Sequence, residues 1–280
     1  MRLTFADVPI AEDDPLPAFE RPPVIEVSVG YLFAGLQSYN SLAVAKLHDV
    51  LRPRYPIVEE HAPLEPTFET FGPAEGSTTQ IRFEMLERAV RPRFFFVADN
   101  QVDLIQIQND RLHYNWRKTS AEAEYPRYPY IRERFSEAWA EVQKWATEQD
   151  LGQPAVTQCE VVYVNRIPLL DQDHKSCGLS RVFHWLTGLP GITEDGAFQY
   201  RQRLNDESGR PVARLIAALS YGTSPSGLRE AQLMLTVRGR PLEASETEFS
   251  KFLEEGRKVI VRTFANLTSD DAHKLWERTQ

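Results

Sequence analysis

The segment from Arg93 to Lys118 constrains the fold most, because the pairing of its strands can be worked out from the residue types. Its sequence is RFFFVADNQVDLIQIQNDRLHYNWRK. Two runs of alternating residues flank Asn109-Asp110, a pattern typical of a β-hairpin with a two-residue turn. This turn would pair Ile107 with Leu112 and Ile105 with Tyr114. Since side chains alternate along a strand, these residues are predicted to share an apolar, buried face.

A third strand would complete an antiparallel meander. A second two-residue turn at Asp99-Asn100 is predicted to bring Phe94 and Phe96 onto the apolar face. The opposite face would carry Phe95 and Leu104 beside six polar residues, Gln106, Gln108, Arg111, His113, Asn115 and Arg117. This mixture suits binding and contains no recognisable catalytic set. We therefore expect an exposed binding site formed by Gln106, Gln108, His113, Asn115 and Arg117.

Composition limits the class of protein and its partners. At 280 residues, 42% of them hydrophobic, the chain can form one large or two small domains with a substantial core. A net charge of -8 argues against a nucleic-acid partner, because affinity for phosphates comes mainly from Lys and Arg. The two cysteines are too few for a disulfide framework, and neither a signal peptide nor a membrane span is evident. We expect a cytoplasmic protein without membrane contact.

The order of the predicted elements repeats along the chain. Residues 1–23 are rich in Asp and Pro and indicate an extended lead-in. The first unit, 24–150, would contain a strand at 24–33, a helix at 41–51, a strand near 79–87, the meander and a helix at 129–147. The second unit, 151–280, would contain a strand at 156–167, a short helix at 179–186, strands at 197–205, 212–221 and 230–238, and a helix at 246–264 after a Ser245 cap. This order predicts an α+β fold made by tandem duplication of an antiparallel-sheet unit with a long covering helix.

Five motifs carry a resemblance to a known family. They are PPVIEV at 22–27, LIQIQNDRLHYNWR at 104–117, YPRY at 125–128 with Phe135, YVNRI at 163–167, and Phe264 with Leu267-Thr268 and Trp276. In these the chain resembles a sporadically distributed family of uncharacterised bacterial proteins of similar length, from about Pro22 to the end. The most specific part is Gln-x-x-x-Asp-Arg-Leu-x-x-Asn-x-Arg, which begins at Gln106. The resemblance implies no activity, and the family's patchy distribution suggests an accessory or conflict-related gene.

Two local sets of residues raise the question of catalysis or metal binding. Asp171, Asp173, His174 and Cys177 are close in sequence, but hard carboxylates with one soft thiolate make an unusual ligand set, so a polar loop is the better interpretation. His113 has no carboxylate partner in the predicted register, and a general base needs one. The familiar hydrolase, zinc-protease and dinucleotide-binding motifs are missing from the sequence. We therefore predict no catalytic residue, no metal site and no cofactor.

Arginines and aromatic residues offer two further binding hypotheses. Asn165-Arg166 at a strand end, together with Arg117, could donate hydrogen bonds to a carboxylate or phosphate, although structural ion pairing is the usual role of such arginines. The run Phe94-Phe95-Phe96 with Trp116 could stack on RNA bases. The predicted register instead turns Phe94, Phe96 and Trp116 into the core.

These observations favour a noncatalytic binding or regulatory protein that acts through the polar face of the meander, with Asn165 and Arg166 as additional binding residues. Its partner is expected to be a protein, which the sequence does not identify, and the sequence leaves homo-oligomer formation open. The alternatives are a hydrolase or nuclease whose acidic residues assemble only in three dimensions, and an RNA-binding module.

Overall fold

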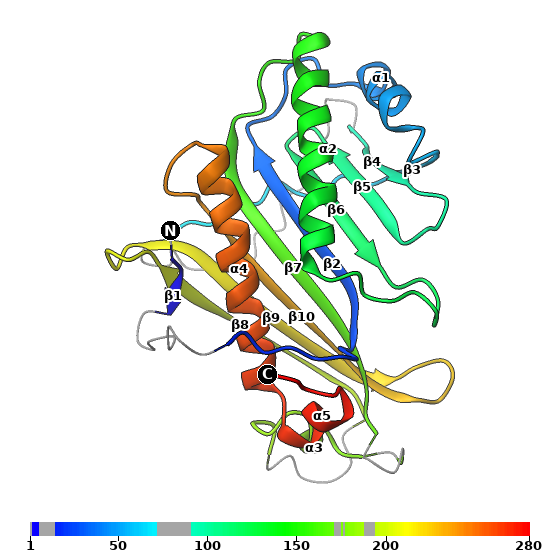
Figure 1. Cartoon of the computed structure of the whole chain (residues 1–280), viewed down its shortest axis with the longest axis vertical. Helices are drawn as coiled ribbons and strands as arrows, with labels where there is room; N and C mark the ends of the chain where they lie inside the picture. The colour runs from blue at the N-terminus through cyan, green and yellow to red at the C-terminus, as the bar shows by residue number, and fades with distance from the viewer. Residues whose placement is uncertain (1, 6–14, 72–90, 171–174, 176, 188–193) are drawn as a thin grey trace, which may run out of the picture.

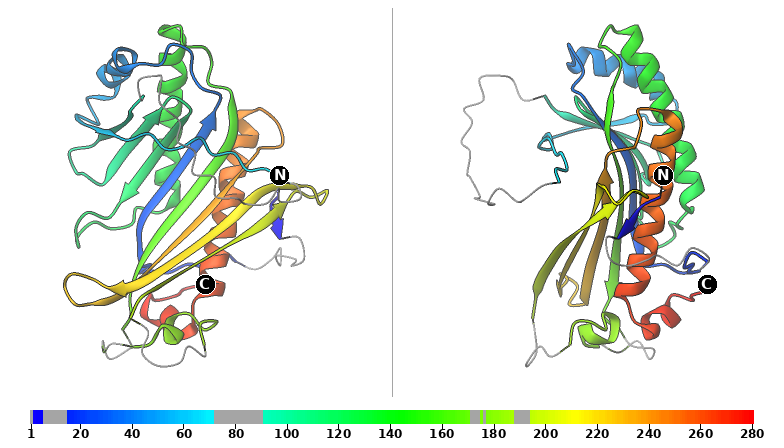
Figure 2. Two further views of the ribbon diagram at one scale, coloured as in Figure 1. Left: turned by 180° about the vertical axis from the view of Figure 1, so that it is seen from behind. Right: turned by 90° about the vertical axis from the view of Figure 1, so that its left-hand side faces the viewer.

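The computed structural model describes residues 2–5, 15–71, 91–170, 175, 177–187 and 194–280. Its strands form one antiparallel sheet in the order β1-β8-β9-β10-β7-β2-β6-β5-β4-β3, which makes the fold α+β. Helices α2 and α4 lie against one face of this sheet (Figures 1 and 2). The elements are β1 (Thr4–Phe5), β2 (Val24–Phe33), α1 (Ser41–Leu51), β3 (Ile57–His61), β4 (Arg93–Val97), β5 (Asp103–Gln108), β6 (Arg111–Arg117), α2 (Tyr128–Glu148), β7 (Val156–Pro168), α3 (Leu179–Val182), β8 (Gly196–Asn205), β9 (Pro211–Thr223), β10 (Arg229–Gly239), α4 (Glu246–Leu267) and α5 (Asp270–Leu275).

The predicted hairpin register is confirmed. Ile107 opposes Leu112 and Ile105 opposes Tyr114, and all four side chains are buried. The predicted two-residue turn at Asp99-Asn100 is wrong, because Val97 lies opposite Leu104 and the Ala98 amide donates to the Asp103 carbonyl, which leaves four residues, 99–102, in the loop. In this loop the Asn100 side chain accepts hydrogen bonds from the backbone amides of Val102 and Asp103. The shift in register is two residues, so Phe94 and Phe96 still lie on the buried face.

The long helices bury the apolar stripes that their sequences predict. On α2 the stripe is Ile131, Phe135, Ala138, Trp139, Val142 and Trp145, and on α4 it is Phe249, Phe252, Leu253, Val259, Ile260 and Phe264. The Ser245 hydroxyl accepts a hydrogen bond from the Glu248 amide and caps α4 as predicted. The structure differs at α3, which has only four residues where the sequence predicted a helix over 179–186. None of the helices in the described part of the chain combines the length and apolar content needed to cross a membrane.

The strands of the two halves follow the same spatial order. From the centre outward, the first half runs β2-β6-β5-β4 and the second runs β7-β10-β9-β8. At the outer edges, β3 of the first half pairs with β4, whereas the strand that pairs with β8 is β1 of the N-terminal lead-in. The two halves meet where β2 pairs antiparallel with β7. Neither β3 nor β1 was expected, and the strand predicted near 79–87 lies outside the described residues. The chain therefore forms one continuous sheet with a helix-covered face and an opposite face that carries the predicted polar residues.

Candidate functional site

An extended segment, residues 62–71, crosses the polar face of the sheet, on the side away from the helices (Figure 2). We call this segment the strap. Two glutamines hold its backbone. The side-chain amide of Gln108 donates to the Leu64 carbonyl at 2.9 Å and accepts from the Leu64 amide at 2.8 Å. Gln158 donates to the Thr67 carbonyl at 2.7 Å and accepts from the Glu69 amide at 2.9 Å. Each glutamine thus satisfies one backbone donor and one acceptor, as a neighbouring strand would.

Arginines on the same face hold the strap by charge. Glu69, only 5% exposed, forms ion pairs with Arg214 and Arg238. The guanidinium groups of Arg240 and Arg214 lie over the rings of Phe68 and Phe71, at 4.3 and 5.1 Å from the ring centres. Two strap carbonyls also accept hydrogen bonds, that of Glu65 from Arg111 and that of Thr70 from Arg214. The face therefore contacts the strap through backbone, acidic and aromatic groups.

A buried charge network lies in the centre of this face. Glu160 on β7 accepts from the Arg238 Nε and contacts His113 Nε2 at 2.9 Å. Burial alone would raise the pKa of Glu160, but the hydrogen bonds and charges of His113 and Arg238 outweigh it and lower this pKa to about 2. His113 reaches Glu160 by lying across β2 at Gly30, where a Cβ atom would stand 2.2 Å from the His113 ring. Gly30 of β2 is thus needed for the side-chain contact between His113 of β6 and Glu160 of β7, the strands on either side of it.

The five predicted binding residues of the meander are mostly engaged by partners within the fold. Gln108, His113 and Asn115 are at most 5% exposed, and Gln106 and Arg117 are half-buried. The expectation of an exposed face is wrong for the first three, because the strap covers Gln108 and neighbouring strands supply partners for the others. Asn115 accepts from Gln106 at 2.8 Å and donates to Glu26, whereas Arg117 donates to the Gln101 carbonyl at 3.1 Å. His113 does have a carboxylate partner, which the sequence does not reveal because Glu160 lies two strands away.

The proposed convergence of Asn165, Arg166 and Arg117 does not occur. Successive residues of a strand point to opposite faces, so Asn165 is buried on the helix side and donates to the Leu233 carbonyl at 3.2 Å. Arg166 is exposed on the other face, in a hollow with Ser220 and Gln232. Asp171, Asp173 and His174 lie outside the described residues, and no group of three or more potential metal ligands occurs among those described.

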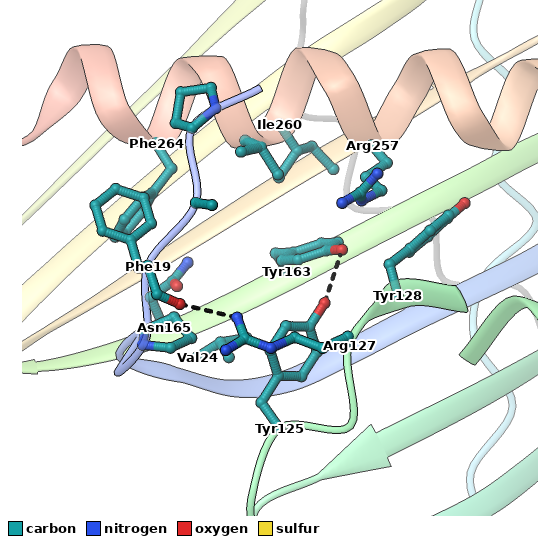
Figure 3. Close-up of a pocket in the computed structure, with 14 residues that line it drawn as sticks. Phe19, Val24, Tyr125, Arg127, Tyr128, Tyr163, Asn165, Arg257, Ile260 and Phe264 are labelled. Carbon is teal, nitrogen blue, oxygen red and sulfur yellow. Dashed lines mark hydrogen bonds between the residues drawn. The ribbon is translucent and has the colours of Figure 1, made fainter. Parts of the chain in front are cut away.

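A pocket opens on the helix-covered face, between α2 and α4, and was not anticipated from the sequence (Figure 3). Its volume is about 110 Å³. Tyr163 and Asn165 of β7 form its floor, and Arg257 and Phe264 of α4 form one wall. The remaining lining residues come from β2, from the start of α2 and the segment before it, from α4 and from the N-terminal segment: Val24, Tyr125, Arg127, Tyr128, Ile260, Val261, Pro17, Ala18, Phe19 and Pro22. The pocket thus joins residues far apart in sequence, including members of four of the five motifs described above.

Neither a family model, nor a curated protein, nor a solved structure matches this chain.

Proposed function

We propose that this chain is a noncatalytic binding or regulatory protein that holds an extended segment of a protein partner against the polar face of its sheet. The paired contacts of Gln108 and Gln158 with a peptide backbone carry this proposal. Each amide contacts both a donor and an acceptor of the extended backbone, so the two glutamines fix its direction and register, as main-chain hydrogen bonds do when a peptide adds to a sheet edge. In the present conformation the strap occupies the site in cis.

The strap indicates what such a partner must contain. Its sequence Thr67-Phe-Glu-Thr-Phe71 places an acidic side chain between two aromatic ones. Arg214 and Arg238 would bind the glutamate of a partner, and Arg240 would stack on the preceding aromatic ring, as they do with the strap. We therefore propose a partner with a Phe-Glu-x-Phe pattern in an extended segment. The local basic charge of this face complements such a segment although the whole chain carries a charge of -8.

A peptide with the sequence of residues 62–71 tests this proposal. The strap competes with it in cis, so the wild-type chain should bind a fluorescently labelled peptide weakly. Replacing Glu69 in the protein by alanine removes the charged contact of the strap and leaves the peptide's own glutamate intact. We expect the Glu69→Ala chain to bind the peptide at least ~10-fold more tightly than wild type, as measured by fluorescence anisotropy. The reason is that its strap, which competes with the peptide, has lost a charge-assisted contact.

Glu65→Ala is the matched control for this experiment. Glu65 is an exposed glutamate of the same strap, and only its backbone carbonyl contacts Arg111. This variant should bind the peptide as wild type does, and a peptide with alanine at its Glu69 position should lose affinity for every chain. Equal binding by the Glu69→Ala and Glu65→Ala chains would refute the proposed site.

We also propose that the α+β fold arose by duplication of a unit with a long covering helix, with units at 24–150 and 151–280 after the lead-in of residues 1–23. Two observations support this proposal: the four inner strands of each half follow the same order, and in each half a helix of about 20 residues follows these strands, α2 with 21 and α4 with 22. Membership of the sporadic bacterial family, a role in an accessory or conflict system, and a cytoplasmic location are further parts of the proposal, supported by the sequence motifs and composition.

The alternative functions have less support. Glu69 and Glu160 are carboxylates that converge on the polar face, but arginines neutralise both of them, which disfavours a hydrolase or nuclease centre there. The aromatic residues that suggested an RNA-binding module do not support it, because Phe94, Phe96 and Trp116 are at most 5% exposed and are not available to stack on bases.

A further inference from the structure

The pocket on the helix-covered face has an unusual balance of charge. Of the 14 described residues that line it, two are arginines and none is acidic. Arg127 is already engaged, since it donates to the Phe19 carbonyl at 2.8 Å and holds the N-terminal segment over the pocket (Figure 3). The Arg257 guanidinium lies over the Tyr128 ring at 4.9 Å, and its buried Nε has no hydrogen-bond partner among the described residues. Arg257 is therefore a cation with donor capacity to spare beside an apolar cavity.

Two tyrosines add a second donor. The hydroxyls of Tyr125 and Tyr163 lie 3.1 Å apart on the pocket floor. Burial raises the pKa of both, so each keeps its proton near neutral pH. A hydroxyl that accepts a hydrogen bond still has its own proton to donate, so one O–H of this pair remains available to a ligand. In Figure 3 the Arg257 side chain reaches from α4 toward these hydroxyls, so the two kinds of donor face the same space.

We propose that this pocket binds a small organic monocarboxylate, with its carboxylate between Arg257 and the Tyr125–Tyr163 pair and its apolar body against Ile260, Val261 and Phe264. Of the two arginines among the described lining residues, Arg257 is the one whose guanidinium has hydrogen-bond donors to spare. Its single positive charge balances one carboxylate, whereas a phosphate dianion would keep an excess negative charge. The pocket volume of about 110 Å³ is close to the roughly 150 Å³ of a cavity known to hold benzene. The apolar body of the ligand is therefore expected to be no larger than a single ring or a short branched chain. The site lies on the face opposite the strap and does not depend on peptide binding.

Titration of the full chain with benzoate tests this site, with benzyl alcohol as the uncharged probe of similar size. In protein with isotopically labelled tyrosine rings, benzoate should shift the ring resonances of Tyr125 and Tyr163, and benzyl alcohol should bind at least ~10-fold more weakly because it lacks the charge-assisted hydrogen bonds. Absence of benzoate-induced shifts, or equal affinities for the two probes, would overturn the proposal without any variant.

A pair of variants on α4 assigns the binding to Arg257. Arg257→Met keeps an apolar stem and removes the guanidinium, whereas Lys258→Met removes an equal charge from the next residue, which is exposed and pairs with Glu255. Arg257→Met should weaken benzoate binding at least ~10-fold and Lys258→Met should leave it unchanged. An Arg257→Met chain that binds benzoate as wild type does, or equal losses in both variants, would contradict the assignment.

Discussion

Replacing Glu160 by glutamine should lower the free energy of unfolding by about 3 to 5 kcal/mol, the usual cost of removing one member of a buried ion pair. The change leaves His113 without its charged partner and removes one of the two carboxylates that neutralise Arg238. The loss reflects the buried position of these groups, and urea denaturation followed by circular dichroism measures it. A loss below 1 kcal/mol would show that the network contributes little to stability.

Glu59→Gln is the matched control, because Glu59 also contacts a histidine, His61, at 2.9 Å but at an exposed site. Exposed pairs contribute about 0 to 1 kcal/mol, so this variant should unfold near the wild-type midpoint. The pH dependence gives a second test. The pKa of Glu160 is about 2 in the folded chain against an ordinary 4.5, so its stabilisation is complete above 4.5 and is lost as the pH falls towards 2. The stability difference between wild type and Glu160→Gln should therefore shrink as the solution is acidified through that range.

Replacing Gly30 by alanine should destabilise the chain by about 3 kcal/mol, the upper part of the range for overpacked sites. The new Cβ would stand 2.2 Å from the His113 ring, so the imidazole must leave Glu160 or the strands must separate. Gly222→Ala on β9 is the control, since its nearest neighbour, the Asp195 Cβ, would lie at an ordinary 3.6 Å. Thermal and urea unfolding of both variants provide the comparison.

A double variant identifies His113 as the cause of the Gly30 effect. Removing the ring by His113→Ala creates space for the new methyl group, so adding Gly30→Ala to that background should cost much less than it does in wild type. Equal costs in the two backgrounds would show that the ring does not lie over Gly30.

Local patterns were sufficient to predict most of the helices and strands. Alternation placed Phe94, Phe96, Ile105 and Tyr114 on the buried face, and an error of two residues at the 99–102 loop left that result unchanged because strand faces repeat every two residues. The stripes of α2 and α4 were equally clear. The pattern failed at β3, whose residues 57–61 are mostly exposed or half-buried and show no apolar periodicity.

The site could not be predicted in the same way, because its contacts are distant in sequence. Glu69 lies 145 and 169 residues from its arginine partners, and Gln108 lies 44 residues from Leu64. Local alternation placed Gln108 and Arg111 of the meander on the polar face, and the alternation of Gln158 and Glu160 on β7 gives the same kind of signal, but neither pattern names a partner. The burial of His113 and Asn115 follows from pairing between strands that only the folded sheet brings together.

Amide hydrogen exchange at the strap tests the central claim most directly. The amides of Leu64 and Glu69 donate to Gln108 and Gln158, so they should exchange slowly in the free chain. Excess peptide of residues 62–71, unlabelled and added in trans, should take the place of the strap and speed exchange at these two amides, while exchange within the β9–β10 ladder stays unchanged. Binding of the peptide with no change at Leu64 and Glu69 would contradict the claim that this face of the sheet is a site for extended protein segments.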